Sequence, residues 1–203
     1  MSAKTIDQAI AALQKGDLKQ ATALFDKIRK KLTQPHHLHA CTVTYLQSGR
    51  PNDAQKMLKE LMAKVKVTPQ LLSLSGDIHK AQANLSAAID DYRRATGLAP
   101  QVPELHYNLA LILFQVSKTT EAKVTIDKAL KIRSNYPKAL VLLGRCLASM
   151  EQFEQAEQAF NKAIKIEPNS YLPHYRLGRL HAHKGNSDKA SESLGRSLQI
   201  NKQ

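Results

Sequence analysis

The chain has 203 residues, and its 30 Lys and Arg exceed its 17 Asp and Glu to give a formal net charge of +13. No apolar run is long enough to span a membrane, and residues 1–10 lack the basic segment and apolar core of a secretory signal. We therefore expect a cytoplasmic protein with no membrane partner. Its two cysteines, Cys41 and Cys146, are expected to be small buried side chains in a reducing compartment.

The predicted elements follow a repeat of 34 residues. The step is kept by five alanines, Ala54, Ala88, Ala122, Ala156 and Ala190, and by four prolines, Pro35, Pro69, Pro103 and Pro137. Cutting at the prolines predicts a single array whose units are 2–34 (degenerate), 35–68, 69–102, 103–136, 137–170 and 171–203.

Each unit predicts two helices, because its apolar residues fall at positions 4, 7, 8 and 11 and again at 20, 24 and 27. The degenerate unit keeps the second stripe, one residue out of phase, as Ala21, Phe25 and Ile28. Small residues at positions 8 and 20 allow the two helices to approach closely, and proline at position 1 suits a first helical turn. Gly49 and Gly185 lie where a turn must join the paired helices.

The unit from Pro137 shows the pattern most fully, as Leu140, Leu143, Gly144, Leu147, Ala156, Phe160, Ala163 and Pro168. It resembles the tetratricopeptide repeat (TPR), and the resemblance extends over the whole chain as about six tandem units of the bacterial type. The resemblance implies an all-α fold, a right-handed α-solenoid of antiparallel helix pairs with about twelve helices and no strands.

No catalytic constellation, phosphate-binding loop or cysteine pair at metal spacing occurs, so we expect neither an enzyme nor a cofactor. The histidines His36, His37 and His39 and the pair His181 and His183 are the candidates for a metal site. The repeat register favours another role for several histidines, because it places them at positions 4 and 11, where the family has large packing residues: His106, His174, His79 and His181. We therefore expect no metal site.

Positions 2, 5, 9, 12 and 13 form a second stripe on each first helix, which in TPR arrays lines a concave peptide-binding groove. The early part of this stripe holds His36, His39, Val43 and Leu46, followed by the polar set Gln70, Ser73, Asp77 and Lys80. The predicted partner-binding residues come later and form an apolar zone of Tyr107, Leu111, Phe114 and Val141 and a basic zone of Lys138, Arg145, Tyr175, Arg179 and His183.

Arg145 and Arg179 both occupy position 9 of successive units, so they should lie side by side. Like charges held together are destabilising unless an anion lies between them, which predicts a partner with acidic residues.

The residue pattern of the clamp by which TPR co-chaperones hold chaperone C-termini matches this sequence poorly. Asn108 and Lys138 match its pattern, but Ser73, Asp77 and Leu142 do not.

The sequence thus predicts a protein-interaction scaffold that binds a protein or peptide in its groove. The alternative is the N-terminal region of a larger enzyme, as in bacterial sulfotransferases that carry TPR units, because the chain stops at position 33 of its last unit without a capping helix. The uncapped unit also predicts self-association. Nucleic-acid binding rests only on the net charge and is disfavoured.

Overall fold

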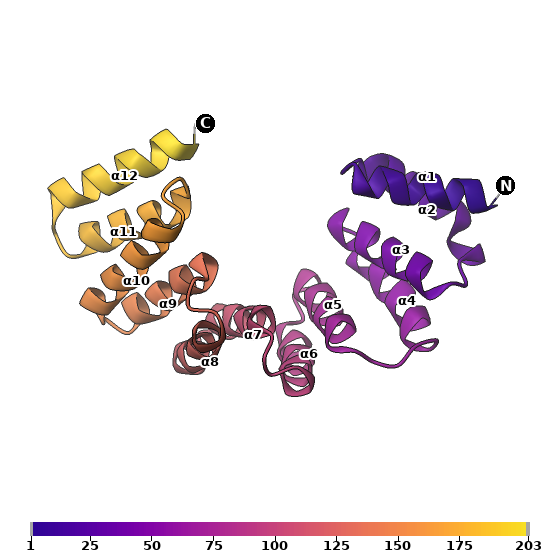
Figure 1. Cartoon of the computed structure of the whole chain (residues 1–203), viewed down its shortest axis with the longest axis horizontal. Coiled ribbons are helices and arrows are strands. Elements are labelled where there is room, and N and C mark those ends of the chain that lie inside the picture. Colours follow the sequence, from indigo (N-terminus) through magenta and orange to yellow (C-terminus); the bar gives the residue numbers. More distant parts are fainter. Residues whose placement is uncertain (1, 202–203) are drawn as a thin grey trace. The chain divides into compact units, whose positions relative to one another are not determined.

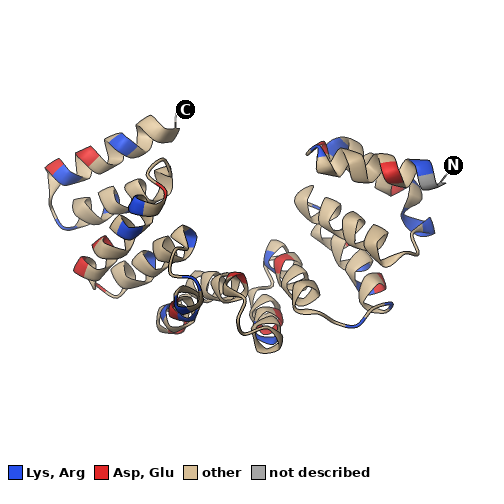
Figure 2. Cartoon of the chain, in the orientation of Figure 1, with Lys and Arg blue, Asp and Glu red and all other residues tan. Residues whose placement is uncertain are grey.

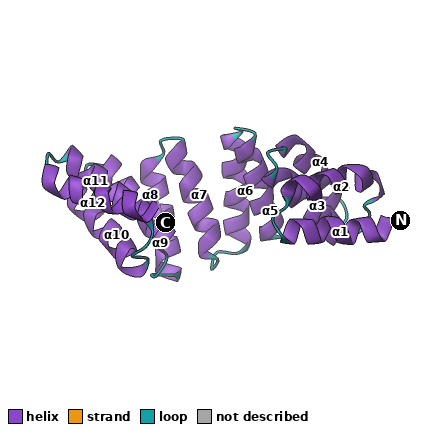
Figure 3. Cartoon of the chain, turned by 90° about the horizontal axis from the view of Figure 1, so that it is seen from above, coloured by secondary structure: helices purple, strands orange, loops and turns teal. Residues whose placement is uncertain are grey.

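The computed structural model describes residues 2–201, and all of its regular structure is helical (Figure 3). The helices of these residues follow in chain order as α1 (Ser2–Gln14), α2 (Leu18–Ile28), α3 (Pro35–Gln47), α4 (Pro51–Met62), α5 (Pro69–Ala81), α6 (Leu85–Leu98), α7 (Pro103–Gln115), α8 (Thr119–Ile132), α9 (Pro137–Ser149), α10 (Phe153–Ile166), α11 (Tyr171–His183) and α12 (Ser187–Asn201). A short 3₁₀ turn, Arg29–Lys31, follows α2. The expected all-α fold is confirmed over these residues, and the last two residues of the predicted unit 171–203 lie outside them.

The first helices of four pairs, α3, α5, α7 and α9, begin at the repeated prolines. Proline fits there because its fixed φ suits a helix and its missing N–H would have no partner in the first turn. At α5 the side chain of Thr68 also accepts a hydrogen bond from the backbone N–H of Leu71. The predicted helix starts at these prolines are therefore confirmed.

In three pairs, glycine at position 8 lets the aromatic or aliphatic residue at position 24 of the second helix pack against the first helix, at Gly76, Gly144 and Gly178. A Cβ atom at Gly144 would lie 2.5 Å from the ring of Phe160. The same close approach joins Gly76 to the ring of Tyr92 at 2.8 Å. The predicted reason for a small residue at position 8 is thus confirmed.

The turns between paired helices share one backbone conformation, with a positive φ at position 15 of the unit. Gly49 and Gly185 meet this need at φ values of 71° and 75°, as predicted for glycine. Three pairs place another residue type there: Ala83 and Ser117 have a φ of 60°, and Glu151 has a φ of 59°. The packed helices hold these residues in a conformation that costs about 1 kcal/mol or more for a residue with a Cβ.

The helices group into two compact units, one of residues 2–98 with α1 to α6 and one of residues 99–201 with α7 to α12 (Figure 1). In each unit a helix packs mainly against the other helix of its own pair. The core of the first unit includes Phe25, Tyr45 and Leu58, and that of the second includes Leu147 and Phe160.

Lys and Arg occur on most helix pairs (Figure 2). In the first unit, arginine forms ion pairs with acidic side chains. Arg50 lies 2.7 Å from a carboxylate oxygen of Asp26 and 2.6 Å from one of Asp53. The hydroxyl of Tyr45 donates a hydrogen bond of 2.9 Å to Asp26. The hydrogen bond from Arg50 is the main cause that holds the pKa of Asp26 below its usual value.

His106 and His181 are buried, so their predicted packing roles are confirmed. His79 is less buried and contacts Asp91, with 2.9 Å between Nδ1 and the carboxylate. His174 is also partly exposed, and its Nε2 lies 3.1 Å from the carbonyl oxygen of Pro168. His106 makes the same kind of contact with the Pro100 carbonyl oxygen at 2.8 Å.

Cys41 and Cys146 are buried free thiols, as expected. Within residues 2–201, every helix is too short or too polar to span a membrane.

Candidate functional site

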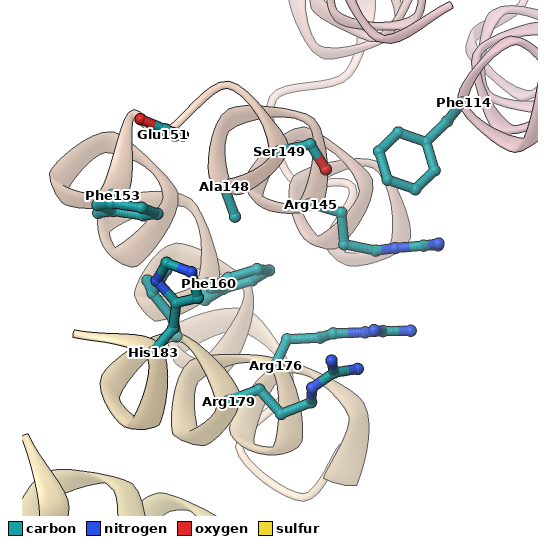
Figure 4. A pocket seen from close by; sticks show the side chains of 11 residues that line it. Phe114, Arg145, Ala148, Ser149, Glu151, Phe153, Phe160, Arg176, Arg179 and His183 are labelled. Carbon is teal, nitrogen blue, oxygen red and sulfur yellow. The ribbon is translucent and has the colours of Figure 1, made fainter. Parts of the chain in front are cut away.

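The second unit contains a cavity of about 500 Å³ bordered by helices α7, α9, α10 and α11 (Figure 4). We call it the arginine pocket, and it is lined by Phe114, Arg145, Ala148, Ser149, Glu151, Phe153, Phe160, Arg176, Arg179, Leu180 and His183. Its volume lies within the range of about 300–1,000 Å³ that is usual for ligand-binding clefts.

Arg145 is half-buried and its guanidinium covers the ring of Phe114, with 4.5 Å between Cζ and the ring centroid. This is the distance of a cation–π contact, which orients the side chain. Burial lowers the pKa of Arg145, and the positive charge of Arg176 lowers it further. Arginine remains protonated in proteins, so the positive charges of Arg145 and Arg176 raise each other's energy.

Arg176 and Arg179 both extend from α11 beside Arg145 (Figure 4). Their Cζ atoms lie 5.6 Å and 5.9 Å from the ring centroid of Tyr175, so this ring supports both side chains. The Nε atom of Arg176 is shielded from solvent and has no hydrogen-bond partner within residues 2–201. A buried donor without a partner is unusual and calls for an acceptor.

None of the three guanidinium groups of the pocket forms an ion pair with an acidic side chain of residues 2–201. Elsewhere in the chain Arg50 binds two carboxylates and Arg133 binds Glu104. The pocket's own Glu151 lies at the other end, near Phe153 (Figure 4). The arginine end therefore carries a local positive charge that no acidic side chain of residues 2–201 neutralises.

The opposite end of the pocket is aromatic. The rings of Phe153, at the start of α10, and His183, at the end of α11, contact each other with centroids 5.2 Å apart. Phe160 lies beneath them and Ala148 faces the same space from α9 (Figure 4). The cavity can therefore bury an apolar group at one end and bind an anion at the other.

The structure brings four of the predicted partner-binding residues together in the pocket, namely Phe114, Arg145, Arg179 and His183, and places Tyr175 next to the arginines. The other four do not line it. Lys138 is exposed near the start of α9, and Leu111 is partly buried on α7. Tyr107 contacts the ring of Tyr136 at 5.5 Å, and Val141 is 5% exposed, so it offers little surface to a ligand.

Arg176 and the residues of the aromatic end, Phe153 and Phe160, were not among the predicted binding residues. Arg176 occupies position 6, which lies outside the groove stripe used for the prediction. Phe153 and Phe160 belong to a second helix, whereas the stripe describes only first helices. The only available signal was the pair of arginines Arg176 and Arg179, three residues apart on the same helix.

In the early part of the stripe, Asp77 accepts hydrogen bonds from the hydroxyl of Tyr92 at 2.7 Å and from the ammonium group of Lys80 at 2.8 Å. These charges are thus compensated inside the first unit. No cluster of three or more His, Cys, Asp or Glu side chains suited to a metal ion occurs within residues 2–201.

The chain is similar to several known proteins. Cellulose synthase operon protein C of Pseudomonas fluorescens (strain SBW25) is 27% identical over 119 residues, which are 55% of this chain and 9% of that protein, so the chain spans a small part of its length. The structure of PilF of Pseudomonas aeruginosa is 19% identical with a TM-score of 0.76, covering 95% of this chain and 88% of that one. YrrB, described as a TPR protein with an unusual peptide-binding site, is 18% identical with a TM-score of 0.64, covering 86% and 90%.

Family models for the tetratricopeptide repeat match residues 103–136, 137–170 and 159–190, and a TPR repeat model matches residues 76–117. Two of these matches begin at the repeated prolines Pro103 and Pro137. Together the matches extend over residues 76–190, and the consecutive helix pairs of residues 2–201 agree with them. The chain belongs to the tetratricopeptide repeat family.

Proposed function

We propose that this protein is an adaptor that binds an acidic segment of a partner protein in the arginine pocket. The TPR fold is a protein-interaction fold, and the observation that carries the proposal is the group formed by Arg145, Arg176 and Arg179, which lacks acidic partners within residues 2–201. Carboxylates of a partner would supply the missing counter-charges and form charge-assisted hydrogen bonds with the guanidinium groups.

Energetics support an anionic ligand. Arg145 is half-buried and close enough to Arg176 for its pKa to be lowered by that charge, so the two guanidinium groups repel each other. A bound carboxylate would convert this repulsion into attraction, and hydrogen bonds to charged groups contribute about 1.5–3 kcal/mol each. The net charge of +13 would also speed the approach of an acidic partner at low ionic strength.

A peptide is the class of ligand we favour, because one cavity joins cationic groups to aromatic surface. YrrB, which shares the fold, is described as having a peptide-binding site, and we extend this use of the fold to the present chain as part of the proposal.

The test is the binding of a fluorescein-labelled peptide of ten residues made of Glu, Gly and Ser, measured by fluorescence anisotropy on the full chain. The double variant Arg145→Gln/Arg179→Gln should weaken binding by about tenfold or more, since each substitution removes a charge-assisted hydrogen bond. The matched control is Lys189→Gln/Arg196→Gln, which also removes two positive charges, from exposed positions on α12, and should change the affinity less than about twofold.

Two outcomes would refute the proposal. One is equal weakening by the pocket variant and by Lys189→Gln/Arg196→Gln, which would mean that the peptide responds only to overall charge. The other is equally tight binding of a control peptide in which every Glu is replaced by Gln.

A second candidate is that this array serves a larger enzyme, such as a TPR-linked sulfotransferase. Its support is that the similar stretch of cellulose synthase operon protein C is only 9% of that protein, so such stretches occur inside longer chains. The intact mass of the protein isolated from its native source decides between them. A mass near 22.6 kDa would exclude the enzyme-linked form.

Self-association through the last helix pair stays a prediction. Leu198 on α12 is 61% exposed and would contact a second copy. Light scattering at high protein concentration should then show dimers that are lost in Leu198→Glu, and a strict monomer would exclude this mode of assembly.

A further inference from the structure

We propose that the arginine pocket selects a two-part motif, an acidic residue followed closely by an aromatic or large aliphatic side chain. The carboxylate binds at the arginine end and the apolar side chain fills the space between Phe153, Phe160 and His183. This inference rests on the proposed function and specifies the partner: a segment of another protein that carries this pair, rather than any acidic chain.

The first argument is the shape of the pocket. A single cavity of about 500 Å³ contains both the guanidinium groups and the aromatic rings, so one short segment can reach both ends. Figure 4 shows Arg145, Arg176 and Arg179 on one side and Phe153 with His183 on the other. A ligand with charge alone would leave the aromatic end unfilled.

The second argument is the exposure of the aromatic end. Phe153 is only partly buried and packs at the edge of the core that includes Phe160, while His183 is exposed. Their ring contact holds two side chains from different helices in one position without covering them. Preformed apolar surface of this kind gains binding free energy from each apolar group that it removes from water.

The third argument is the distribution of charge. Glu151 lies at the aromatic end and makes no ion pair with the arginines of the pocket, so the two ends differ in sign. A phosphate-rich chain such as a nucleic acid would place negative charge along the whole cavity and be repelled by Glu151. An acidic residue next to an uncharged apolar one matches both ends, which fixes the direction of the bound segment.

The test uses three fluorescein-labelled peptides of ten residues with a Gly and Ser background. The first carries two adjacent Glu residues followed by Phe, the second replaces this Phe by Ala, and the third keeps Phe but replaces both Glu by Gln. Binding is measured with the full chain by fluorescence anisotropy. The first peptide should bind about tenfold or more tightly than either of the others, as expected for the burial of one aromatic ring and for the loss of the paired charges.

A blocking variant locates the apolar side chain. Ala148→Leu adds bulk to the aromatic end from α9 without removing a core residue, and Ala182→Leu makes the same change at an exposed position of α11 outside the pocket. The Ala148→Leu variant should no longer bind the first peptide more tightly than the second. The affinity of this variant for the second peptide should stay within about twofold of that of the wild type. That retained affinity also shows that the variant is folded. Ala182→Leu should keep the full advantage.

The outcomes separate this inference from the proposed function. If the first two peptides bind equally well and both depend on the arginines, the proposed function stands and the two-part motif is wrong. If neither acidic peptide binds, the proposed function itself fails. If a ten-nucleotide single-stranded DNA binds as tightly as the first peptide, or if Ala148→Leu and Ala182→Leu behave alike, the selection of an apolar side chain by this pocket is refuted.

Discussion

Replacing Gly144 by alanine tests the close packing on which both the fold and the pocket depend. The added Cβ would lie 2.5 Å from Cε1 of Phe160 and 2.8 Å from both Cδ1 and Cζ of the same ring. Carbon atoms prefer a separation of about 3.5–4.0 Å, so the ring would have to move by about 1 Å. Phe160 is part of the core of the second unit and also lines the arginine pocket, so this movement would disturb both its core packing and the shape of the pocket.

The expected magnitude combines two opposing effects. Overpacking of this kind costs about 1–3 kcal/mol, and three ring atoms in contact place Gly144→Ala toward the upper part of that range. Alanine favours a helix over glycine by about 1 kcal/mol, which offsets part of the cost. We therefore expect the free energy of unfolding to fall by about 1–2 kcal/mol.

The assay is guanidinium chloride denaturation of the full chain, followed by circular dichroism at a helix band. The matched control is Gly195→Ala on α12, where a Cβ would meet nothing within 4 Å. This control should raise the free energy of unfolding by about 0.5–1 kcal/mol, because only the propensity effect remains. The two variants should thus shift in opposite directions. Equal stabilisation by both would refute the close approach of α9 and α10.

Three further predictions concern the turns, the thiols and the acid response. Ala83 has a φ of 60°, so Ala83→Gly should raise the free energy of unfolding by up to about 1 kcal/mol; a loss of stability in a denaturant titration would contradict this. Burial raises the pKa of Cys41 to about 12 and that of Cys146 to about 11. At pH 8 both thiols should therefore react with a disulfide reagent at least about a hundredfold more slowly in the folded chain than in the unfolded chain. Equal rates would show that the thiols are accessible. The hydrogen bond from Arg50 lowers the folded-state pKa of Asp26. The carboxylate of Asp26 therefore stabilises the fold above about pH 4, and this contribution disappears as the pH falls through the lower, folded-state pKa. Asp26→Asn should therefore lose stability at neutral pH and differ less from the wild type at pH 2, and a constant difference across this range would contradict the reasoning.

The helix pairs could be predicted from the sequence because each repeated residue has a steric reason to recur. Gly144 and Phe160 are an example, since only a small residue allows the ring to approach the facing helix. The proline starts follow from the backbone of proline itself. Both properties belong to one residue type and its position, so a single sequence displays them.

The turn conformation was predicted only in part. Glycine commonly adopts a positive φ, so Gly49 and Gly185 predict this conformation by their residue type. Ala83 and Glu151 adopt it although a residue with a Cβ disfavours it. There the packing of the two flanking helices decides the conformation, and local sequence does not reveal it. Such tertiary constraints are visible only once the helices are in place.

The candidate site shows the same division. Arg145 and Arg179 could be chosen in advance because they share one register position, and both line the arginine pocket. Phe153 and Arg176 could not be chosen in advance. Phe153 lies on a second helix, and Arg176 lies at a position of the first helix outside the predicted groove stripe. Val141 lies in that stripe but is buried, since its side chain packs into the core of α9 and α10.

The central claim, that the arginine pocket binds an acidic segment, is tested most directly by nuclear magnetic resonance of the arginine side chains. Nε–Hε signals of the full chain, assigned with Arg145→Gln, Arg176→Gln and Arg179→Gln, are recorded while the peptide with two Glu and one Phe is added. We predict that these three signals shift together and saturate, because carboxylates bind their guanidinium groups, while the signal of Arg196 stays unchanged. Shifts of Arg196 equal to those of the pocket, or no shift of the three signals at saturating peptide, would contradict the account.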